Sequence, residues 1–529
     1  MSLATEAKRG RTFAIISHPD AGKTTLTEKL LLYSGAIHLA GSVQGRKSAR
    51  STVSDWMKME QERGISISSS VLQFDYRGSA LNLLDTPGHA DFSEDTYRTL
   101  AAVDSAVMLM DHAKGVEART LKLFEVCRMR KLPVITFMNK LDREGMDPFE
   151  LIDEVQKTLN LKVVPINWPI GMGHEFRGVV NIKTRQVTVF EGLEGVKKGS
   201  RILEQQTMHF DDAQDLIAPD VYEQVAEELE LLEMAGDEYD HEAFLAGELS
   251  PIFWGSAMTN FGVQPMLEFL ADDTASPSSR EALSGETIRP EDDRFTGFIF
   301  KIQANMNPRH RDRIAFLRVV SGKFERGMEV IVGRSEEKLR LAKPHSFMAQ
   351  ERAIGEEAFP GDIVGLYDPG KLRIGDTIAT NKPLKYAGIP RFAPEHFVRV
   401  ILRETLKRKQ LDKGLDQLSH EGVIQLFFRP EIGRQDPYLG AVGILQFEVL
   451  KQRLQTEYNV KCEFESVPFN VARWVEGPEE SMEWLRSRRD FHLVLDRNDS
   501  PVLLADSIWP LEYAKQQTPG LVFHDVEPL

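Results

Sequence analysis

One segment of the chain combines glycine, lysine and threonine in the order that a phosphate-binding loop requires. Gly22 would let backbone N–H groups approach phosphate oxygens, Lys23 would place an ammonium between two phosphates, and Thr24 would offer a hydroxyl to Mg²⁺. The usual pattern begins with glycine, and Ser17 stands there instead. Taken alone, the motif could be an accidental Gly-Lys-Thr at a strand–turn–helix junction. The predicted phosphate site comprises Ser17, His18, Pro19, Asp20, Ala21, Gly22, Lys23, Thr24 and Thr25.

A second segment, Asp85-Thr86-Pro87-Gly88, has the residue types of a loop that senses the terminal phosphate. We expect Asp85 to lie near Mg²⁺ through a water, and the N–H of Gly88 to bond the γ-phosphate. His89 follows at once, where an imidazole can orient or help deprotonate the attacking water. A lone histidine is more often a surface residue, but its place directly after this loop favours catalysis.

A third segment, Asn139-Lys140-Leu141-Asp142, has the residue types that recognise a guanine base. The Asp142 carboxylate can accept hydrogen bonds from N1–H and from the 2-amino group of guanine. Adenine has neither donor, a mismatch that discriminates by about 10⁴-fold. Ser256 and Ala257 are expected to support the base from a fourth loop. The alternative is an exposed turn, since Asn and Asp favour turns.

Between the first two motifs, a triphosphate switch needs a mobile hydroxyl that completes the coordination of Mg²⁺. Ser66 in the run Gln-Glu-Arg-Gly-Ile-Ser-Ile is the candidate metal ligand, beside Thr24 and Asp85. The stretch 41–53 is rich in Gly, Ser, Lys and Arg, so we expect it to be a loop that can order and disorder.

All four motifs follow apolar runs that predict buried strands. Because the carboxyl ends of parallel strands meet at one edge of a sheet, phosphate, metal and base recognition would converge there. The sequence therefore predicts an α/β P-loop domain with a parallel-type sheet. The predicted strands are residues 13–16, 81–84, 134–138 and 251–254.

The motifs resemble those of the translational GTPases. The resemblance is carried by SHPDAGKTT, by SDWMKMEQERGISIS (54–68), by LLDTPGHADFSEDTYRTL (83–100) and by FMNKLDRE (137–144). Most of these proteins have Thr at the position of Ser66, and serine there resembles the bacterial release-factor branch. Residues 295–327 resemble the β-barrel second domain of the family, and 440–449 resemble a strand-to-helix junction in the third domain of translocases.

The resemblance implies a ribosome-dependent GTPase that uses GTP/GDP and Mg²⁺. His89 would be its catalytic histidine, positioned by the large-subunit RNA at the factor-binding site. Its role would be in translation termination, where it would drive class I release factors off the ribosome after peptide release. The alternative is a translocase-like elongation factor, which we disfavour because such chains continue for further domains beyond the third.

Two further alternatives come from other classes of protein. A metabolic P-loop kinase or ATPase is opposed by the guanine-type segment ending at Asp142. A binding-only switch that holds GTP without hydrolysing it is opposed by His89.

The predicted domains are 1–275 with an insertion at about 148–248, a β-barrel domain at 295–385, and an α+β, ferredoxin-like domain at 395–529. Segments 271–294 and 380–395 are predicted linkers, because polar residues and prolines dominate them. Helices are predicted at 150–161, 220–249, 411–419 and 447–457; strands are predicted at 179–191, 314–320, 328–332, 363–366, 423–428, 441–444 and 460–467.

The composition is that of a globular protein outside a membrane. The 529 residues carry a net charge of −15 and two cysteines, Cys127 and Cys462, with no metal-type spacing. No apolar run approaches the ~18 residues of a membrane span. We expect a cytoplasmic monomer with no membrane partner. The basic clusters at 309–313, 407–409 and 486–489 are more often solvated faces than RNA contacts.

Overall fold

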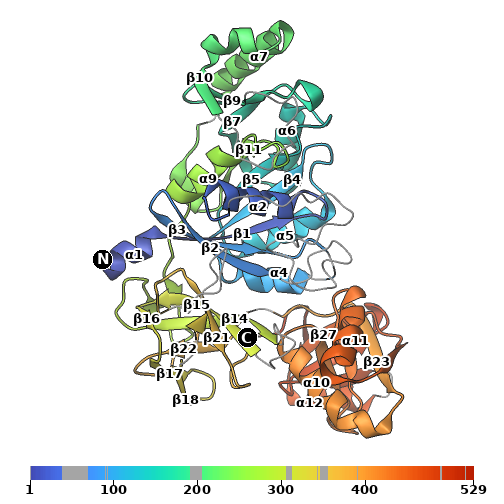
Figure 1. Cartoon of the computed structure of the whole chain (residues 1–529). Helices are drawn as coiled ribbons and strands as arrows, with labels where there is room; N and C mark the ends of the chain where they lie inside the picture. The colour runs from blue at the N-terminus through green and yellow to red at the C-terminus, as the bar shows by residue number, and fades with distance from the viewer. Residues whose placement is uncertain are drawn as a thin grey trace.

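The computed structural model divides into three units along the chain (Figure 1). They are an α/β unit (α1 to α9, 3–272), a β unit (β14 to β22, 296–379) and a C-terminal unit (β23 to β30, 396–524). The predicted fold class, an α/β unit followed by a β unit and an α+β unit, is confirmed. The structure describes residues 2–37, 69–89, 91, 93–190, 205–236, 238–304, 313–341, 344–345, 356–389, 391–488, 491–518 and 520–528.

The α/β unit is built on a seven-stranded sheet in the order β2-β3-β1-β4-β5-β11-β6. Only β2 runs antiparallel to its neighbour β3; the other pairs are parallel. All four predicted strands lie in this sheet. The strands are β1 (Gly10–Ser17), β2 (Ser70–Tyr76), β3 (Ser79–Asp85), β4 (Ser105–Asp111), β5 (Val134–Asn139), β6 (Lys162–Pro165) and β11 (Leu249–Trp254).

Helices cover both faces of this sheet, which is why its strands are apolar throughout. Along β1, Phe13 and Ile15 pack with α2 (Lys23–Tyr33) and α9 (Val263–Asp272). Ala14 and Ile16 face the opposite layer. That layer comprises α4 (Ser93–Leu100), α5 (Ala118–Met129) and α6 (Pro148–Leu159).

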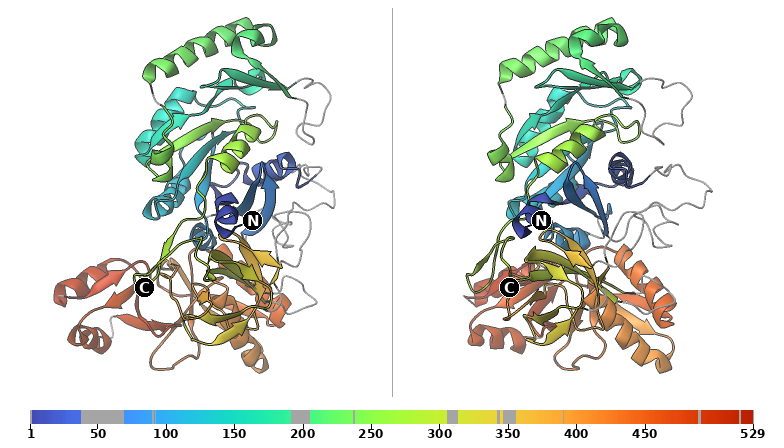
Figure 2. Two further views of the ribbon diagram at one scale, coloured as in Figure 1. Left: turned by 90° about the vertical axis from the view of Figure 1, so that its left-hand side faces the viewer. Right: turned by 60° about the vertical axis from the view of Figure 1, so that its left-hand side comes forward.

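A smaller antiparallel sheet lies at the end of the α/β unit farthest from the other two units (Figures 1 and 2). Its order is β10-β9-β8-β7, with α7 beside it. The bounds are β7 (Asn167–Ile170), β8 (Gly178–Asn181), β9 (Gln186–Phe190), β10 (Gln205–His209), α7 (Pro219–Ala235) and α8 (His241–Leu245).

The predicted single helix over 220–249 is wrong, because three elements occupy that segment. Gly236 adopts a left-handed conformation (φ 68°) that ends α7. Asp240 then caps α8 by accepting hydrogen bonds from the N–H groups of Glu242 and Ala243. Leu249 already belongs to β11. The apolar periodicity was real, but the turn residues that interrupt it decide the structure.

The β unit is a seven-stranded antiparallel sheet in the order β18-β17-β22-β14-β15-β21-β19, with the pair β16–β20 beside it. Its strands are β14 (Thr296–Ala304), β15 (Arg313–Ser321), β16 (Phe324–Glu325), β17 (Glu329–Val332), β18 (Lys338–Arg340), β19 (Pro344–His345), β20 (Glu357–Ala358), β21 (Ile363–Tyr367) and β22 (Thr377–Ala379). The segment before it, expected to be only a linker, contains the hairpin β12 (Arg280–Glu281) and β13 (Thr287–Ile288).

The C-terminal unit is an eight-stranded antiparallel sheet in the order β26-β23-β25-β24-β28-β29-β27-β30. The elements are β23 (His396–Leu402), α10 (Arg408–His420), β24 (Gln425–Phe428), β25 (Tyr438–Ala441), α11 (Leu445–Tyr458), β26 (Cys462–Ser466), β27 (Val471–Glu476), α12 (Glu479–Ser487), β28 (His492–Asp496), β29 (Pro501–Ala505), α13 (Trp509–Gln517) and β30 (Val522–His524).

The strand predicted at 441–444 is wrong, because β25 ends at Ala441 and α11 begins three residues after Val442. The side-chain oxygen of Gln446 accepts hydrogen bonds from the N–H groups of Val442 (2.8 Å) and Gly443 (3.0 Å). These backbone donors are therefore used by a side chain and cannot extend the ladder of the sheet.

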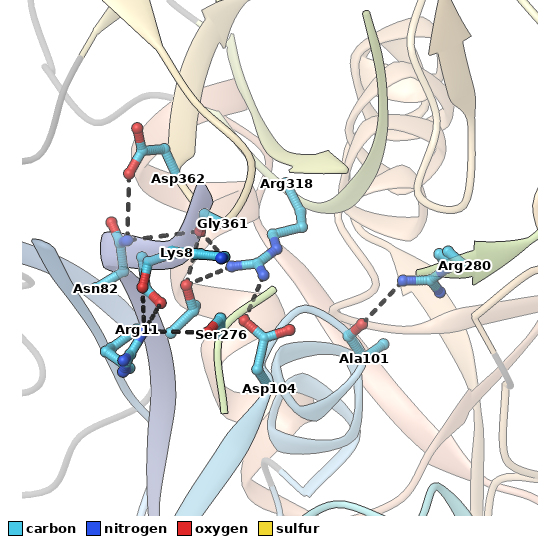
Figure 3. A network of polar contacts seen from close by, with 12 residues as sticks. Lys8, Arg11, Asn82, Ala101, Asp104, Ser276, Arg280, Arg318, Gly361 and Asp362 are labelled. Carbon is cyan, nitrogen blue, oxygen red and sulfur yellow. Dashed lines mark hydrogen bonds and ion pairs between the residues drawn. The ribbon is translucent and has the colours of Figure 1, made fainter. Parts of the chain in front are cut away.

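A buried arginine joins the α/β unit to the β unit (Figure 3). The Arg318 guanidinium donates to the Thr12 hydroxyl and to the Gly361 carbonyl, and it lies 2.5 Å from an Asp104 oxygen. Burial raises the pKa of Asp104, and the Arg318 charge opposes that shift. The carboxylate is thus kept in a buried interface by its cation.

The two interfaces of the α/β unit differ in chemistry. Leu100 and Val103 share one hydrophobic cluster with Phe298 and Phe316 of the β unit. The three clusters within the C-terminal unit contain no residue before Ala393. The first two units are therefore joined by a continuous apolar core, and the third has its own.

We predict that Arg318→Ala lowers the free energy of unfolding by about 3 kcal/mol, because it leaves Asp104 buried without its cation. Arg318 is 4% exposed. Urea denaturation of the full chain measures the change. Arg326→Ala is the matched control: its side chain is 43% exposed and pairs with Glu356 at 2.8 Å, so its loss should cost less than about 1 kcal/mol. Equal stabilities of the Arg318 variant and the wild type would contradict a structural role.

Candidate active site

The predicted site residues meet at the carboxyl edge of the central sheet. Ser17, Asp85 and Asn139 are the last residues of β1, β3 and β5, and the loop with Ser256 follows β11. All predicted site residues except Ser66 are described; Ser66 and the predicted loop 41–53 lie outside the described residues.

The loop between β1 and α2 has the backbone of an anion cradle. Asp20 (φ 65°) and Gly22 (φ 100°) adopt left-handed conformations, and α2 begins at Lys23 without a side-chain cap. A Cβ on Gly22 would overlap the Asn139 amide. The positive φ and this overlap mean that only glycine fits here. Uncapped N–H groups at a helix start attract phosphate, so the loop could bind an anion.

Lys23 and Asp85 form a buried ion pair beside this cradle. Their charged atoms are 2.5 Å apart, and the side chains are only 6% and 2% exposed. The Thr86 hydroxyl donates to the Ile15 carbonyl at 2.6 Å, which fixes the end of β3 against β1. Lys23 thus supplies a cation that a phosphate would need, and Asp85 supplies a carboxylate that a metal ion would need.

Oxygen donors at this point fit a magnesium ion. The Thr24 hydroxyl and the Asp85 carboxylate are hard oxygen ligands of the kind Mg²⁺ takes. Among the described residues, no group of three or more His, Cys, Asp or Glu side chains forms a metal cage. Mg²⁺ is usually held by one or two protein ligands together with phosphates and waters.

The Asn139 amide ties three loops together. Its nitrogen donates to the Ala21 carbonyl at 2.7 Å, and its oxygen accepts from the Ala257 N–H at 2.8 Å. Sequence reasoning assigned Asn139 to the base, whereas in this structure its side chain joins the phosphate loop to the loop after β11. It therefore sets the spacing between the two ends of the site.

Asp142 is oriented by a hydroxyl. Ser256 donates to an Asp142 oxygen at 2.5 Å, and the Thr259 N–H donates to the Ser256 oxygen at 3.2 Å. The second carboxylate oxygen of Asp142 can then accept a donor from a planar base. Support of the base by Ser256 stays a prediction; in this structure its hydroxyl orients Asp142.

Sequence reasoning missed two acidic partners. Asp111, the last residue of β4, lies 2.8 Å from the Lys140 ammonium. Burial works to raise the pKa of Asp111, but bonds to Lys140 and to the Ala113 N–H hold it below its usual value. Its position after the apolar run 106–110 was the available signal.

The second missed partner is Glu117, whose carboxylate lies 2.5 Å from Nδ1 of His18. Burial lowers the pKa of His18, and Glu117 opposes the shift. An uncharged His18 in the phosphate loop leaves the cationic role there to Lys23.

His89 sits at the edge of the site, half exposed at 36%. Its Nδ1 lies 3.3 Å from an Asp91 oxygen. The imidazole is therefore held by a carboxylate from the same loop, which fixes the direction of the ring.

Comparisons with known proteins assign a family to each part of the chain. Residues 8–276 match the family "Elongation factor Tu GTP binding domain", 294–381 match "Elongation factor G domain 2", and 386–515 match "Class II release factor RF3, C-terminal domain". Peptide chain release factor 3 of Symbiobacterium thermophilum is 53% identical over 99% of this chain and 98% of its own length. The chain belongs to the peptide chain release factor 3 family.

A second relative supports the same family. Peptide chain release factor 3 of Synechococcus elongatus is 50% identical over 98% of this chain and 93% of its own length. A crystal structure of a protein from Thermus thermophilus has a TM-score of 0.68 at 24% identity, over 89% of this chain and 70% of that one. The likeness to that crystal structure shows the fold alone.

Family membership makes the protein a translational GTPase of peptide chain release factor 3 type that acts in translation termination. The predicted enzyme class and the guanine nucleotide are therefore confirmed. Within the described part of the chain, no helix has the length and apolarity to cross a membrane.

We predict that Asp142→Asn weakens GTP binding by about 100-fold. The amide NH₂ of asparagine is a donor, and it would face the N1–H and 2-amino donors of guanine. Binding of xanthosine triphosphate should strengthen, since its C2 carbonyl accepts that donor. Calorimetric titration with both nucleotides measures the exchange. Asp153→Asn, an exposed change of the same charge, is the control. Unchanged GTP affinity in the Asp142 variant would remove this residue from the base site.

Proposed function

We propose that this protein is a ribosome-stimulated GTPase that, with GTP bound, drives a class I release factor off the ribosome after peptide release and then hydrolyses GTP and leaves. Its family supports a role in termination, and the contacts of α4 support the mechanism. We further propose that it acts in the cytoplasm, as a monomer at the factor-binding site of the ribosome.

At the nucleotide, each residue has a distinct task. The N–H groups around Gly22 and the Lys23 ammonium bind the phosphates, and Asp142 with Ser256 selects guanine. Thr24 would hold Mg²⁺ directly and Asp85 through a water, with Ser66 as a third oxygen. The ion would neutralise charge on the phosphates as the terminal one is transferred to water.

His89 is the proposed catalytic residue. Its ring would orient the attacking water or take its proton, and large-subunit RNA would fix it in place. Because the side chain is half exposed and lies at a loop, hydrolysis by the free protein should be slow.

The observation that carries the mechanism is that α4, which follows the loop from Asp85 to His89, contacts both other units. Asp95 lies 3.2 Å from the Lys301 ammonium of the β unit. Arg98 donates to the carbonyls of Glu421 and Gly422 in the C-terminal unit, both at 3.4 Å. A change in the loop at Gly88 on binding or losing the γ-phosphate would therefore shift how these units sit against the nucleotide.

We predict that His89→Ala leaves GTP affinity close to wild type and lowers ribosome-stimulated hydrolysis by about 10²-fold, the range for a positioned base or orienter. Phosphate release with and without purified ribosomes measures both rates. His174→Ala, whose side chain is largely exposed, controls for the loss of a histidine. Stimulated rates equal to the wild type would show that His89 is not catalytic.

We predict that the protein with GTP accelerates dissociation of a fluorescent class I release factor from post-release ribosomes by about tenfold, a typical coupling between two sites. A non-hydrolysable analogue should support dissociation but delay departure of the protein itself. The Asp142→Asn variant gives the control, because its effect should follow xanthosine triphosphate instead of GTP. If the release factor's dwell time did not change and peptidyl-tRNA advanced, a translocase would be the better assignment.

A further inference from the structure

Asp91 joins the proposed catalytic histidine to the C-terminal unit. One of its carboxylate oxygens lies 3.3 Å from Nδ1 of His89, and its backbone N–H also approaches Nδ1 at 3.3 Å. Either tautomer of the ring can therefore bond Asp91 through Nδ1.

The other oxygen of Asp91 serves a helix of a different unit. It accepts a hydrogen bond from the N–H of Leu445 at 2.6 Å, and Leu445 is the first residue of α11. The N-cap position of α11 is Ile444, which has no side-chain acceptor. Asp91 thus acts as the cap of α11 from another unit, and its charge also favours the positive end of that helix.

This contact depends on close approach at Gly443. A Cβ there would overlap both the backbone and the side chain of Asp91. The N–H of Gly443 is already occupied by Gln446, which fixes the backbone just before α11. Any side chain at 443 would therefore push α11 away from Asp91 without touching the nucleotide site.

Arg119, on α5, is a second charged group that the Asp91 carboxylate influences. The three nitrogens of the Arg119 guanidinium are buried and make no hydrogen bond to any residue that the structure describes. Burial lowers the pKa of Arg119 to about 10, while Tyr97 and Asp91 oppose that shift. A buried cation without a partner is costly, so a carboxylate released near it would be drawn to it.

We propose that Asp91 is a positioning residue that holds His89 against the C-terminal unit in the free protein and so restrains hydrolysis until that unit moves. When α11 withdraws, Leu445 leaves the carboxylate, Arg119 takes it, and His89 is freed. The separate hydrophobic cores of the C-terminal unit make it the unit that moves. The inference rests on the catalytic role proposed for His89.

The test uses the full chain without ribosomes, with kcat and KM for GTP as readouts. Gly443→Ala and Asp91→Ala should each raise ribosome-free kcat by about tenfold and leave KM unchanged, because each removes the hydrogen bond from the Leu445 N–H to the Asp91 carboxylate. The double variant should gain no more than either single one. Gln455→Ala, exposed on the same helix, is the control and should match the wild type.

Two further variants separate the possible failures. Arg119→Gln should reduce the gain of Gly443→Ala, and His89→Ala should abolish it. If neither Gly443→Ala nor Asp91→Ala raises kcat, or if their effects add, the restraint is refuted. The catalytic role of His89 is decided separately, by the rate of hydrolysis of His89→Ala on ribosomes. If that rate falls but Gly443→Ala does not raise the ribosome-free kcat, the restraint is refuted and the catalytic role stands. A gain in kcat cannot come from partial unfolding.

Discussion

Helix α4 is the element on which the arrangement of the three units depends. Two of its charged side chains reach other units: Asp95 pairs with Lys301 of the β unit, and Arg98 donates to backbone carbonyls of the C-terminal unit. Asp95 bonds the backbone N–H and hydroxyl of Ser69 at 2.7 and 2.5 Å, while Lys301 donates to the Ser69 carbonyl at 2.7 Å. Ser69 is the first described residue after the predicted loop of Ser66. The segment that should respond to nucleotide is therefore tied to α4 and to the β unit at one point.

The buried charges where α4, Ser69 and the β unit meet favour a single arrangement of the three. Burial works to raise the pKa of Asp95, but Lys301 and the two bonds from Ser69 hold it below its usual value. An ion pair taken out of water contributes little net stability, yet leaving one partner alone is costly. Asp95, Lys301 and Ser69 are therefore stable together only when all three are in contact. Apolar packing alone would tolerate several arrangements.

The sequence was enough to predict where the strands of the central sheet end, but not which residues their polar side chains contact. Apolar runs before polar motifs predicted β1, β3, β5 and β11, because a strand covered on both faces must be apolar. The roles of Asn139 and Asp91 depend on contacts with residues 118 and 354 positions away, which no local pattern records.

Local misassignments had a local cause. The helix predicted over 220–249 was split by Gly236 and Asp240, whose turn and cap chemistry outweighs apolar periodicity. The basic residues proposed as surface patches were also partly misjudged. Arg313 is paired with Asp368 at 2.9 Å and is largely buried, so it stabilises the β unit.

The chemistry of the interfaces indicates which of them can open. Separating the α/β unit from the β unit would expose Leu100, Phe298 and Phe316 to water, a cost that grows with the apolar area. The contacts to the C-terminal unit run largely through Arg98, Asp91 and backbone groups, and water can replace such partners when they part. The ring of Tyr97 against Phe392 (4.4 Å) is an apolar exception. A switch driven by a single phosphate has only a few kcal/mol available. It can separate polar contacts of this kind, and it cannot open a shared core.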